Sequence, residues 1–375
     1  MSINIFMNDQ YTCSAPFIAM SFLNIVRPCC QIIEPSTPNL ATHPDKPLDF
    51  YLERRQQVQK SYIDYNSHPG CDTCLRQNHP YANFFNANWP IQRNNNYSSD
   101  IKQLHIQFNN KCNLACRMCS PSFSSMHDKE SGGNGEIRHN IAPHTKLYSQ
   151  LVDKIDEIEY LYLTGGESFL DPTTWDFLEK CVTKDRAKHI QLQINTNGTV
   201  SLNKHQLNIL DKFKQRFIHI SIDGTGSMAE YTRTGLVWDK WSKNLDKYIK
   251  YFTNESISIV YTVSALNVWQ FGEDCDFYKK EFKFGLHWST LTHPHGLSIS
   301  NLSNHAKQHL NDKYKNTRYK NITNLMNDVN EVQNVSIANY IDMLDERAIK
   351  YNKWPNYIRY STRFPDYWKL INTNS

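Results

Sequence analysis

The stretch Lys111–Cys119, which reads K-C-N-L-A-C-R-M-C, decides most of what the sequence says about this chain. Its three cysteines, Cys112, Cys116 and Cys119, have the spacing C-x3-C-x2-C. Cysteine thiolates are the usual ligands of a four-iron, four-sulfur (4Fe-4S) cluster, and three of them leave one iron open to a ligand that is not protein. An alternating pattern over residues 104–109 predicts a strand just before the cysteines, so the site is expected at its carboxyl end, where barrel enzymes do chemistry. A zinc site or unrelated buried thiols are the alternative interpretation.

A second motif, Gly165-Gly166-Glu167, follows the apolar run 158–164, which predicts the next strand. Two glycines let a backbone approach a ligand closely, and a carboxylate accepts hydrogen bonds from an ammonium group. Two further alternating runs predict strands with one apolar and one polar face: 190–195 and 218–223. Polar faces on successive strands indicate outer helices and a polar lumen, which favours an incomplete, open barrel over a closed one filled with apolar side chains.

The composition divides the chain into three regions. Residues 1–100 are irregular and rich in proline, with one candidate helix over 48–62. Residues 101–295 alternate strands and helices, which predicts an α/β fold, a partial (β/α)6 TIM barrel. The last two strands are expected at 257–264 and 284–290, and the helices at 145–156, 172–183, 203–213, 238–252 and 268–282. Residues 296–375 are helical and aromatic, and are expected to form an extension that covers the mouth or the open side of the barrel.

The cysteine spacing and the Gly-Gly-Glu triplet together resemble the radical S-adenosylmethionine (radical SAM) enzymes. In that family, S-adenosylmethionine (SAM) chelates the open iron, and its reductive cleavage gives methionine and a 5′-deoxyadenosyl radical. The resemblance implies that Gly165, Gly166 and Glu167 bind the methionyl amino group. It also implies that Met118, where the family usually has an aromatic residue, lies against the adenine. Further implied contacts, to the ribose or the methionyl carboxylate, are those of Ser221, Asp223 and Arg233. Asn197 is another candidate, with a turn-forming role in Asn-Gly as its alternative.

A second set of cysteines precedes the barrel sequence: Cys13, Cys29, Cys30, Cys71 and Cys74. Four thiolates suit a second 4Fe-4S cluster or a tetrahedral zinc. The pattern resembles half of the auxiliary-cluster module called SPASM or twitch, in which one cysteine precedes a hairpin, another follows it and a C-x2-C comes later. One member of the adjacent pair would then be spare. A structural zinc site is the alternative, since thiolates accept either metal.

Other features of the composition limit the function classes. The net charge of +4 gives no global basic footprint for nucleic acid, and the run 15–26 is too short and interrupted for a signal or membrane span. A cytoplasmic protein is expected, in which ten cysteines favour metal ligation over disulfides. Cys181 and Cys275 lie in helical patterns and are expected in the core. His293 and His295 make an incomplete metal site without a third ligand.

Three functions remain compatible with these residues. The first is a radical SAM enzyme acting on a peptide or protein, as SPASM and twitch relatives often do, with an electron donor such as flavodoxin or ferredoxin implied. The second is the same chemistry on a nucleoside or another small metabolite. The third is a non-catalytic protein stabilised by iron-sulfur or zinc. The sequence singles out no catalytic side chain.

Overall fold

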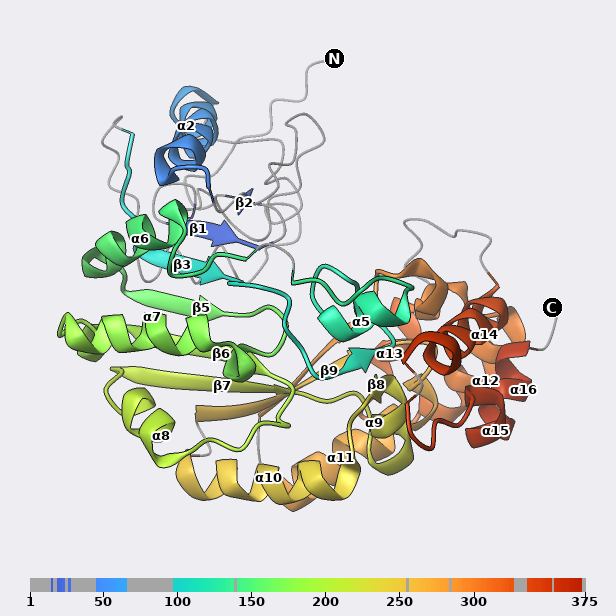
Figure 1. Cartoon of the computed structure of the whole chain (residues 1–375). Coiled ribbons are helices and arrows are strands. Elements are labelled where there is room, and N and C mark those ends of the chain that lie inside the picture. The colour runs from blue at the N-terminus through green and yellow to red at the C-terminus, as the bar shows by residue number, and fades with distance from the viewer. Residues whose placement is uncertain are drawn as a thin grey trace, which may run out of the picture.

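The structure, a computed structural model, describes residues 15, 19–23, 26–27, 45–65, 97–137, 140–253, 256–282, 285–326, 336–352 and 354–372. One large sheet organises these residues, with the strand order β10-β9-β7-β6-β5-β3-β1-β2. Its strands are β1 (Ala19–Phe22), β2 (Val26–Arg27), β3 (Gln103–Ile106), β5 (Tyr160–Leu163), β6 (Gln191–Thr196), β7 (Gln215–Ser221), β9 (Ile257–Val263) and β10 (Gly285–Thr290). All run parallel except β2, which pairs antiparallel with β1. The sheet curves into the predicted partial barrel (Figure 1).

Helices cover the outer face of the sheet and gather beyond the carboxyl ends of its strands (Figure 1). The outer helices are α6 (Lys146–Asp153), α7 (Pro172–Thr183), α8 (Lys204–Leu210), α10 (Trp238–Tyr251) and α11 (Phe271–Phe282), and α2 (Leu48–Tyr65) lies beside β1. Near the strand ends lie α5 (Ser125–Glu130) and α9 (Gly226–Thr232). The C-terminal extension contains α12 (Asn304–Tyr314), α13 (Asn321–Leu325), α14 (Ile337–Arg347), α15 (Tyr360–Arg363) and α16 (Pro365–Asn372).

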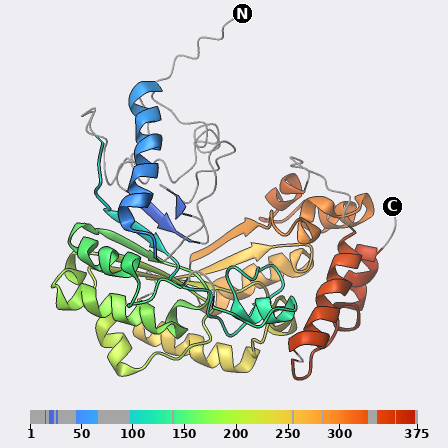
Figure 2. The same ribbon diagram turned by 45° about the horizontal axis from the view of Figure 1, so that its top comes forward.

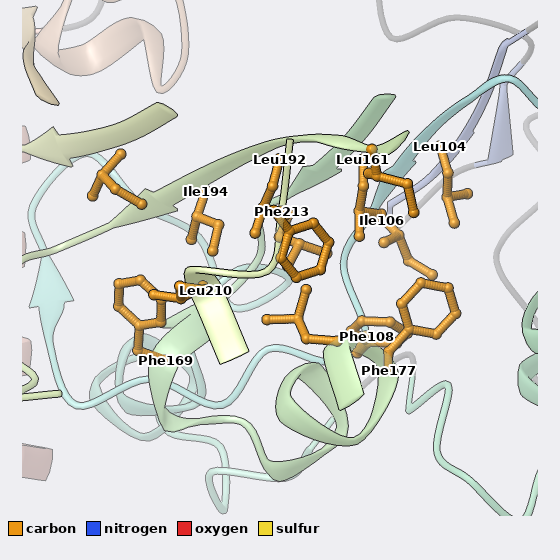
Figure 3. Close-up of a cluster of buried hydrophobic side chains, with 14 of the residues drawn as sticks. Leu104, Ile106, Phe108, Leu161, Phe169, Phe177, Leu192, Ile194, Leu210 and Phe213 are labelled. Carbon is orange, nitrogen blue, oxygen red and sulfur yellow. The ribbon is translucent and has the colours of Figure 1, made fainter. Parts of the chain in front are cut away.

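The apolar face of each strand forms the core between the sheet and the outer helices. The strand residues drawn in Figure 3 include Leu104, Ile106, Leu161, Leu192 and Ile194. They pack with four residues from helices and loops: Phe108, Phe177, Leu210 and Phe213. Full burial of one such side chain contributes about 1.5–3 kcal/mol, so this layer holds the barrel wall.

The opposite face of the strands is polar and lines the lumen, as the alternation predicts. Along β6, Gln193 and Asn195 are half-buried while their neighbours are buried. The Asn195 amide donates to the Tyr162 hydroxyl at 2.7 Å, and the Tyr162 ring stacks on His105 with centroids 4.2 Å apart. The sequence therefore predicted correctly both the six barrel strands and the two characters of their faces.

The strand β1 was not predicted. Its four residues are all buried, and Ser21 stands in register with His105 of β3, so the N-terminal region adds a seventh parallel strand to the barrel edge (Figure 2). Arg55 of α2 is almost fully buried and donates to the Asp100 carbonyl at 2.8 Å. The segment Ala19–Phe22 reads A-M-S-F, with a single polar residue among four, so it lacks the strict alternation that predicts a strand. Within the described residues, no helix combines the length and the apolar character needed to cross a membrane.

Candidate functional site

The three cysteines of the loop after β3 line one cavity of about 740 Å³. The loop is fixed on both sides. Ser124 caps α5 and donates to the Leu114 carbonyl at 2.6 Å, and the Cys119 amide donates to the Cys116 carbonyl at 3.0 Å. A short strand β4 (Ala115–Cys116) also pairs with β8 (Arg233–Thr234), which places Cys116 opposite Arg233.

The three thiols, on half-buried residues that line the cavity, fit an iron-sulfur cluster. Burial raises the pKa of all three, to about 12 for Cys112. Because the thiolate is the form that binds metal, sulfurs in this environment need a cationic ligand in order to ionise. Among the described residues, no group of three or more His, Cys, Asp and Glu side chains is placed to hold a single metal ion. A 4Fe-4S cluster does not need the sulfurs to converge on one point, because each thiolate binds a different iron.

The Gly-Gly-Glu motif needs glycine at both positions, one because of its backbone conformation and the other because it packs on the cysteine loop. Gly165 has φ +130°, a conformation that side chains rarely adopt. A Cβ on Gly166 would lie 2.0 Å from the Lys111 carbonyl oxygen, and that oxygen accepts a hydrogen bond from the Glu167 amide at 2.7 Å. The motif therefore docks directly beside Cys112, and both glycines line the cavity.

Glu167 is not part of the cavity lining, and its side chain holds the end of β6. Its carboxylate accepts from the Thr196 hydroxyl at 2.7 Å, the Asn197 amide at 2.6 Å and the Phe169 amide at 3.2 Å. The side chain is almost fully buried, and burial raises its pKa despite these donors. Its contact with a methionyl amino group stays a prediction.

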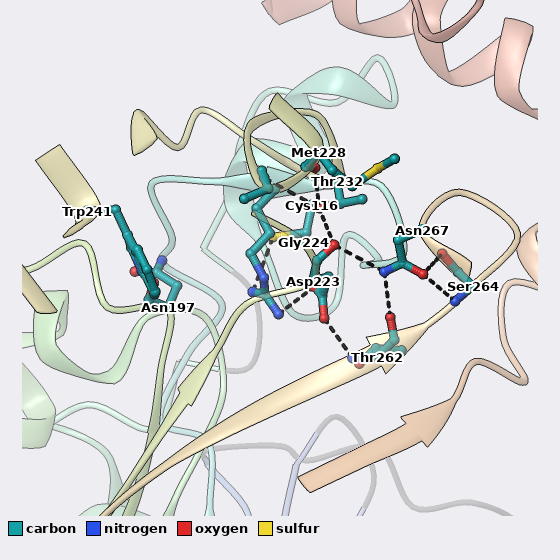
Figure 4. A network of polar contacts seen from close by, with 12 residues as sticks. Cys116, Asn197, Asp223, Gly224, Met228, Thr232, Trp241, Thr262, Ser264 and Asn267 are labelled. Atoms are coloured by element: carbon teal, nitrogen blue, oxygen red, sulfur yellow. Dashed lines mark hydrogen bonds and ion pairs between the residues drawn. The ribbon is translucent and has the colours of Figure 1, made fainter. Parts of the chain in front are cut away.

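Asn197 has the turn-forming role and also lines the cavity, while its contact with SAM stays a prediction. Its side-chain oxygen accepts from the Thr199 amide at 2.9 Å, which is the turn-forming contact. Its side-chain nitrogen donates to the Asn113 side chain at 2.9 Å and lies 3.9 Å from the Cys112 sulfur. The Trp241 indole donates to the Asn197 carbonyl at 3.0 Å and fixes the turn from outside (Figure 4). Asn197 thus ties the end of β6 to the cysteine loop.

An ion pair between Asp223 and Arg233 forms the next part of the cavity wall. Arg233 Nη2 lies 2.7 Å from Asp223 Oδ2, and Arg233 Nη1 lies 3.7 Å from the Cys116 sulfur. The other Asp223 oxygen accepts from the Thr262 amide at 2.7 Å, as Figure 4 shows. The pair leaves the wall electrically neutral next to a cysteine sulfur. Two more predicted residues, Met118 and Ser221, line the same cavity.

The comparison with known families agrees with this geometry. Residues 106–278, from the end of β3 to α11, match the radical SAM superfamily. This segment of the chain forms a radical SAM domain. A radical SAM domain implies a 4Fe-4S cluster and SAM as cofactors, and the cysteine loop and the cavity fit both. No curated protein was found to match the chain.

Solved structures similar to this radical SAM chain include native anSMEcpe with bound AdoMet, with 21% identity over 50% of each chain and a TM-score of 0.39. A structure of native anSMEcpe with bound AdoMet and Cp18Cys peptide has 19% identity over 49% of each chain and a TM-score of 0.38. Streptococcus suis SuiB bound to precursor peptide SuiA has 15% identity over 70% of this chain and 59% of that chain, with a TM-score of 0.38. The chain spans about half the length of the first of these proteins.

Several residues that line the cavity were not singled out by the sequence. They are His127, Asn195, Thr262, Tyr340 and Arg347. Asn195 stood on the predicted polar face of its strand, and its buried side-chain oxygen has no hydrogen-bond partner within the described part of the chain. Tyr340 and Arg347 come from α14, for which the sequence offered a helical pattern and no functional signal.

The remaining cysteines and histidines have separate outcomes. Cys13, Cys29, Cys30, Cys71 and Cys74 lie outside the described residues, so their metal stays a prediction. Cys181 and Cys275 are buried in the core, as predicted. His293 lines the cavity with its ring 4.0 Å from that of His295, and no third ligand joins them among the residues that the structure describes.

Proposed function

We propose that this chain is a radical SAM enzyme that abstracts hydrogen from a peptide or protein substrate. One observation carries the proposal: a single cavity is lined by all three cysteines and by Gly165, Gly166, Asn197, Ser221, Asp223 and Arg233, from neighbouring strand ends. The cysteines would hold the cluster, and the other residues, with Met118, would hold SAM. When bound, the cluster supplies the electron that cleaves SAM to methionine and a 5′-deoxyadenosyl radical, which takes hydrogen from a substrate carbon and leaves as 5′-deoxyadenosine.

The chain's own residues prepare this chemistry in three ways. The Asp223–Arg233 pair puts no net charge on the wall beside Cys116, so it does not repel the zwitterionic methionyl group. The docking of Gly166 on Lys111 fixes the distance between the strand-end loop and the cysteine loop. The environment of the three half-buried cysteines raises the pKa of their thiols, so the sulfurs ionise only when a cationic group such as the cluster binds them.

A peptide substrate is supported by the resemblance of the N-terminal cysteines to an auxiliary-cluster module. That resemblance expects a hairpin between Cys13 and the pair Cys29 and Cys30, and the β1–β2 hairpin lies between them in the chain. The auxiliary cluster would exchange an electron with the substrate or anchor it, and a flavodoxin or ferredoxin would supply the electron for SAM cleavage.

The same chemistry on a nucleoside or another small metabolite is the second candidate. The cavity volume of about 740 Å³ favours it, because this value lies within the range of small-molecule pockets. Co-incubation with peptide extracts or with metabolite extracts, followed by mass spectrometry for consumed substrate, separates the two candidates.

The deciding experiment is anaerobic SAM cleavage. The chain is reconstituted with iron and sulfide, SAM and dithionite are added, and 5′-deoxyadenosine is quantified by mass spectrometry. We expect product from the wild type and none from Cys112→Ala, Cys116→Ala or Cys119→Ala. The matched control is Cys181→Ala, a buried core cysteine outside the cavity, which should retain cleavage. Absence of 5′-deoxyadenosine from the wild type, or undiminished product from a ligand variant, overturns the proposal.

A further inference from the structure

The cavity has one fixed charge that the protein does not neutralise. Three side chains with a fixed charge line it: Asp223, Arg233 and Arg347. The first two form the ion pair described above. Within the described part of the chain, no carboxylate lies within ion-pair distance of Arg347, and its guanidinium makes no hydrogen bond. The lining therefore carries one uncompensated cation, which favours an anionic ligand.

Arg347 and Tyr340 lie on the same wall of the cavity. They stand seven residues apart on α14, which places them on one helix face about 10 Å apart along its axis. Both line the cavity, and neither the Tyr340 hydroxyl nor the guanidinium has a hydrogen-bond partner among the residues described. The residues expected to hold SAM lie on the strand ends and the cysteine loop, so α14 is a separate wall.

The position of this wall is rigid. Asp345, two residues before Arg347, is fully buried and accepts from the Tyr231 hydroxyl of α9 at 2.7 Å and from the Tyr360 amide at 2.9 Å. On the other side, Gly296 packs so closely on the Tyr340 ring that a Cβ there would lie 2.4 Å from it. A subsite on α14 would therefore be preformed, which lowers the entropic cost of binding.

The chemistry of the pair matches a carboxylate. A guanidinium offers two parallel N–H donors that fit the two oxygens of a carboxylate, and a phenol adds a third donor. His127, which lies close enough for its pKa to respond to Arg347, has that pKa lowered, mainly by burial. It therefore adds little positive charge at neutral pH, and a singly charged group balances the wall better than a phosphate dianion.

We propose that Arg347 and Tyr340 form a subsite for a carboxylate of the substrate, which makes the substrate an acidic peptide. The carboxylate is a Glu or Asp side chain or a free C-terminus. This inference rests on the proposed function, because it names the substrate class of the same cavity. It is distinct from the proposed SAM site, whose residues lie on the strand ends and the cysteine loop.

The test measures peptide retention, which needs no SAM cleavage. The reconstituted full chain with SAM is mixed with three pools of random hexapeptides and passed through a rapid desalting column. One pool carries a fixed Glu and an amidated C-terminus, the second has Gln in its place, and the third has Gln and a free C-terminus. We expect one carboxylate pool to be retained at least about fivefold more than the neutral pool. The first and third pools tell a side-chain carboxylate from a C-terminal one.

Variants decide whether Arg347 is responsible. Arg347→Gln should bring the retention ratio to about one, and Tyr340→Phe should lower it less. The control is Arg359→Gln, a half-buried arginine of the same C-terminal segment that lies outside the cavity lining, and it should keep the ratio. A wild-type ratio near one, or an unchanged ratio in Arg347→Gln, overturns the inference. So does a loss of SAM affinity in Arg347→Gln with peptide preference intact. SAM cleavage measured in the absence of peptide tests the proposed function independently of this inference.

Discussion

Arg117 lies between two cysteines of the motif, and its guanidinium forms an ion pair with Glu130 of α5 at 2.5 Å. The two side chains are 0% and 2% exposed. Arg117 also donates to the Leu344 carbonyl of α14 at 3.2 Å, and the Trp354 indole donates to Glu130 at 3.0 Å. The cysteine loop is therefore held against the C-terminal extension by a buried charge network.

Loss of Arg117 should destabilise the chain severely. Arg117→Met leaves the Glu130 carboxylate buried without its cation, which costs about 3–5 kcal/mol of unfolding free energy. The matched control is Arg318→Met, which breaks an exposed ion pair with Asp276 and should cost no more than about 1 kcal/mol. Urea unfolding of both variants measures the difference. Similar small losses would show that the Arg117 network contributes little to stability.

Glu167→Gln should weaken SAM binding while leaving the iron content unchanged. The carboxylate touches no cysteine, but it holds Thr196 and Asn197, which line the cavity. A glutamine would keep one acceptor oxygen, but its NH2 group would face a donor that now binds the carboxylate. The Asn197 turn should therefore shift, at a free-energy cost of about 1–3 kcal/mol. Equilibrium dialysis with SAM and an iron assay measure the two effects. The control Glu179→Gln removes an exposed partner of His205 and should change neither; loss of iron in Glu167→Gln would contradict this role.

The free energy of unfolding should decrease as the pH rises, because of Asp274. Burial raises the pKa of this carboxyl from 3.8 to about 6, although Thr225, Tyr261 and Gln270 donate hydrogen bonds to it. The folded state therefore holds the proton more tightly than the unfolded state, and this contribution is lost as the pH rises through about 6. Linkage gives a loss of about 1.4 kcal/mol between pH 5 and pH 7.5. The wild-type stability minus that of Asp274→Asn should fall by this amount in urea unfolding, and a constant difference would contradict the raised pKa.

The fold could be predicted where a single physical signal dominated. Alternation located three of the six predicted strands and an apolar run located a fourth, and the helix from Pro172 to Thr183 matched its bounds because Asp171 caps it and Pro172 occupies its first turn. The strand β1 was missed because its partner, β3, lies more than 80 residues away and supplies the burial that defines it. Non-local pairing leaves no mark in a short local pattern.

The site was predictable in its residues and less so in their contacts. The glycines, the cysteines and the Asp223–Arg233 pair all meet at one cavity, as expected from strand ends on one edge of a parallel sheet. The direction of Glu167 was not predictable, because it depends on amides that only the folded turn at Asn197 presents. Arg347 could not be singled out from the sequence for a similar reason: its proposed role depends on no carboxylate lying within ion-pair distance among the described residues, which is a property of the packing.

The last prediction concerns the number of clusters, and it tests the N-terminal cysteines that lie outside the described residues. If Cys13, one of Cys29 and Cys30, Cys71 and Cys74 hold a second 4Fe-4S cluster, the reconstituted chain should contain about eight irons. The triple alanine variant of the cysteine loop should then keep about four, because an all-cysteine cluster needs nothing from the barrel site. Alanine at only one of the adjacent pair should lower this residual iron, since the other is spare. Metal analysis of these variants measures the outcome. Zinc in place of the residual iron would identify a structural zinc site, and the radical chemistry at the barrel would then operate without an auxiliary electron relay.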